Sequence, residues 1–513
     1  MKHIARSTLI IAIFFGLEKV LGFVRHVIIA RSFRLSAELD AFNAANNIPD
    51  LVFALISGGA LAMAFIPVLS KTREEKGREQ TWLLFSRITN LIFLAAIGLS
   101  LLIALGANQL VSWEIGIAPG FGREQQQLVV RLMRLNLIAT VLFALGGLAI
   151  AGLQAHQHFL LPALAPSMYD LGSLAGILIL APEKGFQLGP ITLPAFGLGV
   201  DGLVYGVIFG AALFLLVQIP GLLRFQFRWT PSLSLGDSSV LEVLRLMGPR
   251  VLTVLFIHLI FLTQDNLASR LSVGAVTALV YGWLFMQVPQ SVIGTALGTA
   301  LLPTLAEQTA RGEREKFHGT LEVSIQTMIA LSVPAGVILA INLPPLIEIL
   351  NFDSAGSDLV VWTARAYLTG LLGHCLLEIS ARSFYARHNA VVPLITSGIS
   401  LIAFLLVGVF LTGWLGAPGI GLANSLVFTL EAVLLFYLLY RPLPYRPRLK
   451  STLLRTAAAS AVGAGISVLL LSLVDLSGQS SLLSAAAAGG ASLIAAAGAA
   501  PFVIPEIKAL LRV

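Results

Sequence analysis

Four ionisable side chains lie close together near the start of the chain: Glu18, Lys19, Arg25 and His26. Glu18 and Arg25 are seven residues apart, so a helix would put them on one face, with Lys19 and His26 on the neighbouring stripe. A mainly cationic sector suits an anion, and the forked guanidinium of Arg25 suits a phosphate in particular. We therefore expect an anion-binding surface here. A structural ion-pair cluster between helices is the alternative.

The surrounding sequence makes these charges unusual, because residues 15–34 read FGLEKVLGFVRHVIIARSFR and are otherwise largely apolar. An ionisable residue at membrane depth costs at least ~2.5 kcal/mol unless it faces a cavity or a partner. Arg31 and Arg34 lie at the end of the run and can extend to the membrane surface. The deeper charges are therefore predicted to line a cavity.

The composition identifies a membrane protein. Of the 513 residues, 57% are hydrophobic and 12% are charged, whereas soluble proteins average about 25% charged residues. The formal charge of +7 fits basic cytoplasmic loops and does not require a nucleic-acid partner. The single cysteine, Cys375, can form no intrachain disulfide, and the Cys and His spacing fits no zinc site.

The length of the apolar runs predicts an all-α polytopic fold, because a spanning helix needs about 20 apolar residues. The runs do not alternate as the strands of a membrane barrel would. We expect fourteen spans, near residues 7–31, 41–69, 82–112, 128–154, 160–181, 197–223, 240–270, 275–306, 320–345, 359–384, 391–413, 417–440, 452–475 and 482–511.

The connecting loops support this count, since every second loop is basic and the loops between them are not. This is the pattern expected when the basic loops and both termini are cytoplasmic. The basic segments contain Lys2 and Arg6; Lys71, Arg73, Lys76 and Arg78; Arg224 and Arg228; Arg311, Arg314 and Lys316; Arg387; Arg441, Arg446, Arg448 and Lys450; and Lys508 and Arg512.

A loose internal repeat suggests two halves. Residues 64–79 read AFIPVLSKTREEKGRE and residues 300–315 read ALLPTLAEQTARGERE, six spans apart and on the same side of the membrane. Such a repeat relates two lobes about an axis along the membrane normal, with a site between them. We predict an N-lobe (residues 1–230), a C-lobe (residues 231–445) and two C-terminal helices (residues 446–513). A chance likeness between loop entries is the alternative.

Other polar residues within the predicted spans are candidates for gating or ion coupling. Asp40 begins the second span, where an acid also favours a helix N-terminus. Asp265 and Arg270 are near the end of the seventh span and could be interfacial, while Glu378 and Arg382 could satisfy each other as an i, i+4 pair. No catalytic constellation and no nucleotide-binding loop is present, so we expect a transporter without a cofactor rather than an enzyme. An ion gradient, the membrane potential or substrate turnover would drive it.

Six motifs stand out along the chain: VLGFVRHVIIARSF (20–33), DAFNAANNIPDL (40–51), AFIPVLS (64–70), MGPRVL (247–252), ALGTALLPTLAE (296–307) and SFYARHNAVVP (383–393). Together they resemble the MurJ/MviN lipid II flippases of the multidrug/oligosaccharidyl-lipid/polysaccharide exporter superfamily. The resemblance covers nearly the whole chain. It implies fourteen helices, two lobes around a cationic cavity, a lipid-tail groove at the last two helices, and export of a lipid-linked peptidoglycan precursor by alternating access.

The resemblance carries over residue by residue. The family's GFxR arginine is Arg25, the basic residue before it is Lys19, and the aspartate of its DAF motif is Asp40. Elsewhere the chain departs from the pattern. His26 stands where an acid often follows the motif arginine, and Asn389 replaces an acid that could take part in sodium coupling. The positions that depart from the family's basic residues in span 2 and its Asp and Arg in span 8 are Val52, Phe53, Ala54, Trp283 and Leu284.

The leading hypothesis is a lipid II flippase of the bacterial cytoplasmic membrane. Arg25, Lys19 and His26 would bind the substrate. Asp40 and Glu18 would complete the site and take part in the charge rearrangement between the inward-open and outward-open states. We expect it to act as a monomer in the phospholipid membrane. The alternatives are a flippase for another undecaprenyl-pyrophosphate-linked saccharide, a cation-coupled exporter of amphiphiles that uses sodium or protons, and a scaffold that does not transport.

Overall fold

A computed structural model describes residues 2–56, 59–234, 236–387, 389–441, 448–474 and 480–511. Arg446 and Arg512, predicted to be cytoplasmic, lie outside these residues. The described chain is α-helical apart from short π and 3-10 segments and one small antiparallel hairpin, in which Gln187 pairs with Thr192. The helices form two compact units, Met1–Asn266 and Leu267–Val513, with α8 crossing the boundary.

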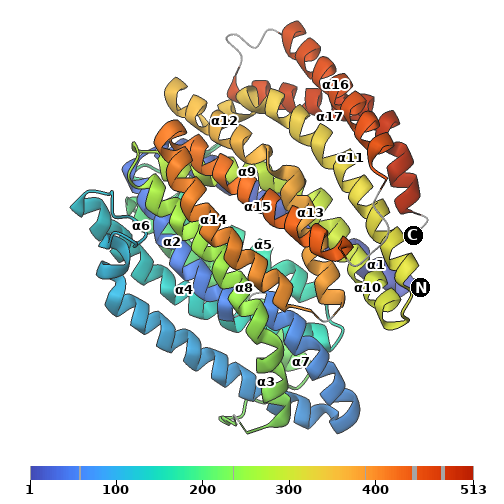
Figure 1. Ribbon diagram of the computed structural model, residues 1–513. Helices are drawn as coiled ribbons and strands as arrows, with labels where there is room; N and C mark the ends of the chain where they lie inside the picture. The colour runs from blue at the N-terminus through green and yellow to red at the C-terminus, as the bar shows by residue number, and fades with distance from the viewer. Residues whose placement is uncertain are drawn as a thin grey trace. The chain divides into compact units, whose positions relative to one another are not determined.

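Unit 1 contains the N-terminal helices and the hairpin (Figure 1). Its elements are α1 (Lys2–Phe33), α2 (Ala37–Ile56), α3 (Gly59–Ser112), α4 (Arg123–Ala155), α5 (Leu160–Ala175), η1 (Gly176–Leu180), β1 (Gln187–Leu188), β2 (Ile191–Thr192), α6 (Gly199–Leu216), α7 (Ile219–Arg224) and most of α8 (Ser238–Ala268).

Unit 2 contains the remaining helices, and α16 and α17 pack against α11 within it (Figure 1). Its elements are α9 (Ala275–Gln290), η2 (Ser291–Thr295), α10 (Ala296–Ala310), α11 (Arg314–Ile347), η3 (Glu348–Leu350), α12 (Ser354–Leu368), α13 (Leu371–Ala386), α14 (Val391–Leu415), α15 (Ala417–Tyr440), α16 (Lys450–Leu473) and α17 (Ser481–Leu510).

The all-α polytopic fold is confirmed. Among the described residues, eleven helical segments are long and apolar enough to cross a membrane, and each coincides with one of the fourteen predicted spans. The other three predicted spans are also helical. They are the run at 7–31, which is part of α1, the run at 41–69, whose described residues belong to α2 and the start of α3, and the run at 359–384, which the structure divides into α12 and α13 on either side of Thr369 and Gly370.

The charged stretch after the second predicted span is helical rather than an open loop. It belongs to α3, which is interrupted at Gly77, where φ is 79° and ψ is −178°. This region of φ favours glycine because a Cβ atom would be crowded there. The helix of the apolar run therefore continues into the charged stretch, and the helix axis changes direction at Gly77.

Different connecting segments contact each other at the two ends of unit 1. At one end Arg78 donates to Gln226 Oε1 and Trp82 Nε1 donates to the Phe225 carbonyl, over 2.5 Å and 3.1 Å. At the other, Gln125 Nε2 donates to the Ala37 carbonyl over 2.9 Å. The 33 residues of α4 separate these ends by about 50 Å. The basic segments at 71–78 and 224–228 thus share an end, as the predicted alternation requires; which end is cytoplasmic stays a prediction.

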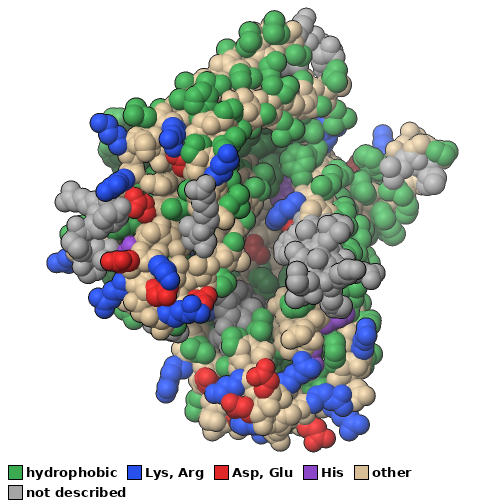
Figure 2. Space-filling model, turned by 90° about the vertical axis from the view of Figure 1, so that its right-hand side faces the viewer, with side chains coloured by type: hydrophobic (Ala, Val, Ile, Leu, Met, Phe, Trp, Pro, Cys, Tyr) green, Lys and Arg blue, Asp and Glu red, His purple; other side chains and the backbone are tan. Residues whose placement is uncertain are grey.

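The surface is apolar over wide areas, as Figure 2 shows for one face. Large side chains such as Leu105, Leu406 and Leu493 are more than two-thirds exposed. In water such a surface would drive aggregation, whereas in a bilayer the lipid tails cover it. Because lipid tails are as apolar as these side chains, helices in lipid associate through van der Waals contact, and small residues let them approach closely. In unit 1, η1 and α6 meet at Gly176 and Gly206, where neither residue has a side chain to separate the backbones.

Candidate functional site

Arg25 is the centre of a polar cluster inside unit 1. Its Nη1 donates to the hydroxyl of Tyr169 over 2.7 Å, and its guanidinium carbon lies 5.0 Å from the centre of the Tyr169 ring. Its Nε lies 3.5 Å from Oδ1 of Asp170, which is almost fully buried. Because α1 packs on α5, an arginine in the middle of an apolar helix meets two adjacent polar side chains.

A cavity of about 270 Å³ adjoins this cluster. Tyr169 lines it together with residues of α2, α4 and α6, and Asp50 and Asn136 contribute polar groups to the wall. Asp50 is exposed towards the cavity and lies within electrostatic range of Arg25. Asn136 is buried and donates to Asn46, while no described group donates to its Oδ1 atom. The cavity wall therefore offers carboxylate and amide oxygens, and Tyr169 links it to Arg25.

The other predicted site residues of α1 are Glu18, Lys19 and His26. Glu18 and Lys19 form an ion pair of 3.3 Å, and both act electrostatically on Asp170, as Arg25 does. Lys19 is 69% exposed and free to reach a ligand. His26 turns back along its own helix, with Nδ1 2.7 Å from the Gly22 carbonyl oxygen. The structure thus brings Glu18, Lys19 and Arg25 to one neighbourhood, while the His26 ring is engaged with the backbone.

Asp40 and Asp265 form a second polar neighbourhood in unit 1. Both carboxylates are buried and lie within electrostatic range of each other. Asp265 accepts a hydrogen bond from Nδ2 of Asn47, seven residues after Asp40 on α2. Asp265 is therefore a buried carboxylate with a specific partner. Arg270 follows α8 in an exposed turn of unit 2.

The predicted coupling residues in unit 2 lie in separate places. Arg382 Nη2 pairs with Glu378 over 2.9 Å, as the i, i+4 spacing predicted, and Arg382 Nη1 donates to Thr299 on α10 over 2.9 Å. Asn389 stands before α14, where its Oδ1 accepts from the backbone N–H groups of Val391 and Val392 over 3.2 Å and 3.3 Å. Its observed contact is thus a helix cap. Among the described residues no group of three His, Cys, Asp or Glu side chains could hold a metal ion.

The sequence comparison decides the family. The family model described as "Lipid II flippase MurJ" matches residues 29–486, which is most of the chain. The chain belongs to this family. It is therefore a multi-pass membrane protein of a bacterial flippase family and not an enzyme.

Individual MurJ relatives match a similar share of the chain. The lipid II flippase MurJ of Burkholderia cenocepacia is 29% identical over 456 residues, covering 87% of this chain and 85% of the relative. The probable lipid II flippase MurJ of Bdellovibrio bacteriovorus is 27% identical over 479 residues, covering 90% and 87%.

Solved structures bear out the same fold. A lipid II flippase MurJ in an inward closed conformation superimposes with a TM-score of 0.77 at 19% identity, covering 95% of this chain and 98% of that one. An inward-facing multidrug resistance MATE family transporter of the MOP superfamily gives a TM-score of 0.67 at 11% identity, covering 86% and 95%. At these identities the likeness concerns the fold alone.

One place where this chain departs from the MurJ motifs is packed among aromatic rings. Trp283, at a position where the family pattern has an acid, has its ring 5.6 Å from the Tyr367 ring and 5.2 Å from the His374 ring. His374 is buried, with Nε2 3.0 Å from Asn424 Oδ1. An aromatic cluster thus occupies this part of unit 2, and His374 belongs to it.

Some residues of these clusters were missed in the sequence analysis. Tyr169 carried no signal, because an aromatic residue in an apolar run is ordinarily a packing residue. Glu431 did carry one, since it is an acid inside the apolar run of α15. It is buried, with Oε1 3.4 Å from the Thr396 hydroxyl and no described partner for Oε2.

Proposed function

We propose that this protein moves lipid II from the inner to the outer leaflet of the bacterial cytoplasmic membrane by alternating access, with both termini in the cytoplasm. The observation that carries the proposal is the position of Arg25 beside a cavity, in a chain of the MurJ family. A pyrophosphate offers several oxygens to a guanidinium fork, and lipid II carries one. We propose that this protein acts as a monomer.

In this mechanism Arg25 and Lys19 bind the pyrophosphate, and the acids regulate their availability. Asp170 holds the Arg25 guanidinium in the absence of substrate, and Glu18 holds Lys19. An arriving pyrophosphate competes with these carboxylates for the same N–H groups. Asp40 and Glu18 then take part in the charge rearrangement between inward-open and outward-open states, and Asp265 shares the role of Asp40 because it lies in range of it. His26 tunes the cationic sector from its neighbouring position.

The test is complementation in a bacterium depleted of its own lipid II flippase, with surface-exposed lipid II as the readout. We expect the parent chain to restore exposure and Arg25→Ala to abolish it at equal expression. Arg131→Ala is the matched control, because Arg131 is a 60% exposed arginine of unit 1 that pairs with Asp201 instead of the cavity residues. Full activity of Arg25→Ala would overturn the assigned role.

A well-expressed parent chain that fails to restore lipid II would favour another substrate. The first candidate is a different undecaprenyl-pyrophosphate-linked saccharide, which the same arginine could hold. The second is a cation-coupled exporter of amphiphiles, favoured by the carboxylate of Asp50 in the cavity wall and by Asp170 beside it. Dye efflux that depends on a sodium or proton gradient, and is lost in Asp50→Asn, would support the exporter.

A further inference from the structure

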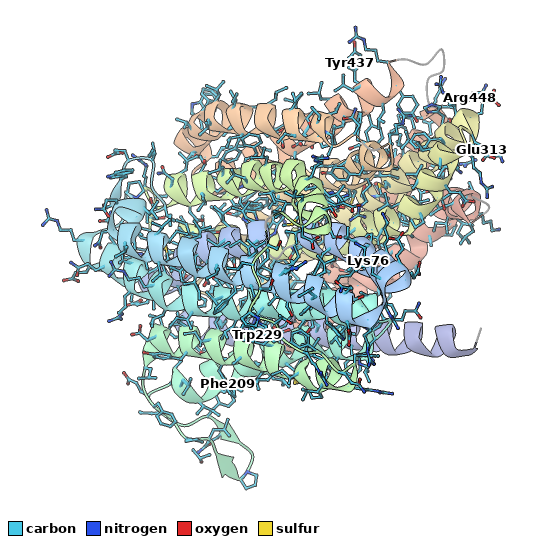
Figure 3. All side chains as sticks on the ribbon, turned by 90° about the horizontal axis from the view of Figure 1, so that it is seen from below. Lys76, Phe209, Trp229, Glu313, Tyr437 and Arg448 are labelled. Carbon is cyan, nitrogen blue, oxygen red and sulfur yellow. The ribbon has the colours of Figure 1, made fainter. Side chains whose placement is uncertain are left out.

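A second cavity, of about 450 Å³, lies in unit 2, and its lining includes none of the residues proposed to bind the transported lipid. It is bordered by the turn between α10 and α11, the first residues of α11 and the residue that follows α13. Arg314, His318 and Arg387 supply its charged and titratable groups, and Gly312 and Phe317 complete that wall. Figure 3 labels Glu313 in this turn, at the end of unit 2 that also holds Arg448.

Neither arginine of this cavity has an acidic partner among the described residues. Glu313 pairs with Lys316 over 3.1 Å, and Glu307 pairs with Arg311 over 2.6 Å, so these two acids are engaged elsewhere. Arg387 instead lies over the ring of Phe317, with its guanidinium carbon 4.4 Å from the ring centre. Two guanidinium groups therefore face one cavity without a described counter-charge.

Arg314 and Arg387 are close enough for their charges to repel each other. Burial lowers the pKa of Arg387, and the charge of Arg314 lowers it further. Like charges held together in a partly buried site destabilise the protein unless an opposite charge joins them. This arrangement, on helix ends whose backbone fixes both positions, is unfavourable when the cavity holds only water.

Further polar groups lie at the same cavity. His318 is part of its lining, and the buried Nδ1 of its ring has no hydrogen-bond partner among the described atoms. The N-terminus of α11, a helix of 34 residues, adds backbone N–H groups and a partial positive charge. Two guanidinium forks, an imidazole and a helix N-terminus form a set of donors that matches the oxygens of a phosphate.

We propose that this cavity binds a phosphate-bearing anion, with the phosphate between Arg314 and Arg387. The surroundings favour the phosphodiester of an anionic membrane lipid over a soluble phosphate compound, because α14 begins close to Arg387 and presents Val391 and Ile395, each 56% exposed, as lipid-facing side chains. Such a site would couple unit 2 to the acidic lipid content of the membrane. It does not depend on which lipid the protein transports.

The experiment measures lipid adducts of the full-length protein by native mass spectrometry, with phosphatidylglycerol against phosphatidylcholine at matched chain length. We expect phosphatidylglycerol to bind preferentially and the double variant Arg314→Gln/Arg387→Gln to lose about tenfold or more in affinity, since each hydrogen bond to a charged group contributes at least that much. Arg311→Gln is the control, because Arg311 is on the same turn but is exposed and paired with Glu307.

A second experiment distinguishes a lipid phosphodiester from a soluble phosphate compound. It measures the thermal unfolding temperature of the parent and of the double variant with and without inorganic phosphate. Stabilisation of the parent alone, without a preference for phosphatidylglycerol, would support the anion site and assign it to a soluble phosphate compound. Equal lipid preference and equal phosphate response in parent and double variant would overturn the proposal. Arg387→Lys keeps the positive charge but lacks the guanidinium fork, so we expect it to bind phosphatidylglycerol with intermediate affinity. Intermediate binding would show that the loss in the double variant is not caused by misfolding.

Discussion

Arg25 and Tyr169 contact each other in two ways: the guanidinium donates to the phenol oxygen over 2.7 Å and also lies 5.0 Å from the centre of its ring. The two residues are 144 positions apart, on α1 and α5. The hydroxyl fixes the direction of the fork, and the ring supports the charge from one side. Tyr169 is therefore a positioning residue for the arginine proposed to bind the substrate.

The phenol hydroxyl can be tested separately from the ring. We expect Tyr169→Phe to reduce flipping by about tenfold while leaving some activity, because a hydrogen bond to a charged group contributes about 1.5–3 kcal/mol and the cation–π contact remains. Tyr169→Ala should lose both contacts and be close to inactive. The measurement is surface-exposed lipid II in the depleted strain; activity of Tyr169→Ala equal to that of Tyr169→Phe would show that the ring does not support Arg25.

The pair formed by Asn47 and Asp265 makes a prediction about stability. Asn47→Ala would leave a buried carboxylate without this donor, at a cost of about 1–3 kcal/mol. Thermal unfolding in detergent should therefore occur at lower temperature. Asn108→Ala, at an exposed position of α3, is the control.

A double-mutant cycle isolates the Asn47–Asp265 interaction itself. Asp265→Asn removes the charge that needs the donor, so adding Asn47→Ala to it should cost less than Asn47→Ala does alone. If the two effects simply add, the hydrogen bond contributes little and Asp265 is stabilised by other groups.

His156 predicts a pH dependence of stability. It follows α4, outside the spanning segment, with its ring stacked 4.5 Å from that of Trp82, and burial lowers its pKa below the ordinary 6.5. Since the unfolded chain then binds the proton more readily than the folded one, the free energy of unfolding should fall as the pH drops through about 6.5. The pKa of the neighbouring His158 is lowered by burial in the same direction.

The test compares thermal unfolding at pH 7.5 and pH 5.5 for the parent and for His156→Gln/His158→Gln. The double variant removes both titrations and should show a smaller loss on acidification. An unchanged loss would assign the acid sensitivity to other groups.

The glycine contact between η1 and α6 makes a prediction about packing. A Cβ atom on Gly176 would lie 2.6 Å from the Cα of Gly206, which is backbone and cannot rotate away. We expect Gly176→Ala to cost about 1–3 kcal/mol through overpacking. Gly98→Ala on α3 has open space around it and should be neutral or stabilising. Equal unfolding temperatures for the two variants would contradict the close approach.

The sequence by itself determined the fold class, the helices and the positions of charges along them. This follows because a segment in lipid must satisfy its backbone hydrogen bonds internally, so run length predicts a helix directly. It also determined that Glu18 and Arg25 share a face, since residues seven apart in a helix always do. The motifs that resemble MurJ were sufficient to identify the family before any geometry was known.

Only the tertiary structure decided which side chains meet across helices. Periodicity places Asp265 on a helix but cannot say that α2 presents Asn47 to it, 218 residues earlier in the chain. The break between α12 and α13 and the turn at Gly77 likewise have weak sequence signals, because one or two residues change direction within an otherwise continuous run. Partner choice depends on how helices rotate and pack against one another, and that depends on all their contacts at once.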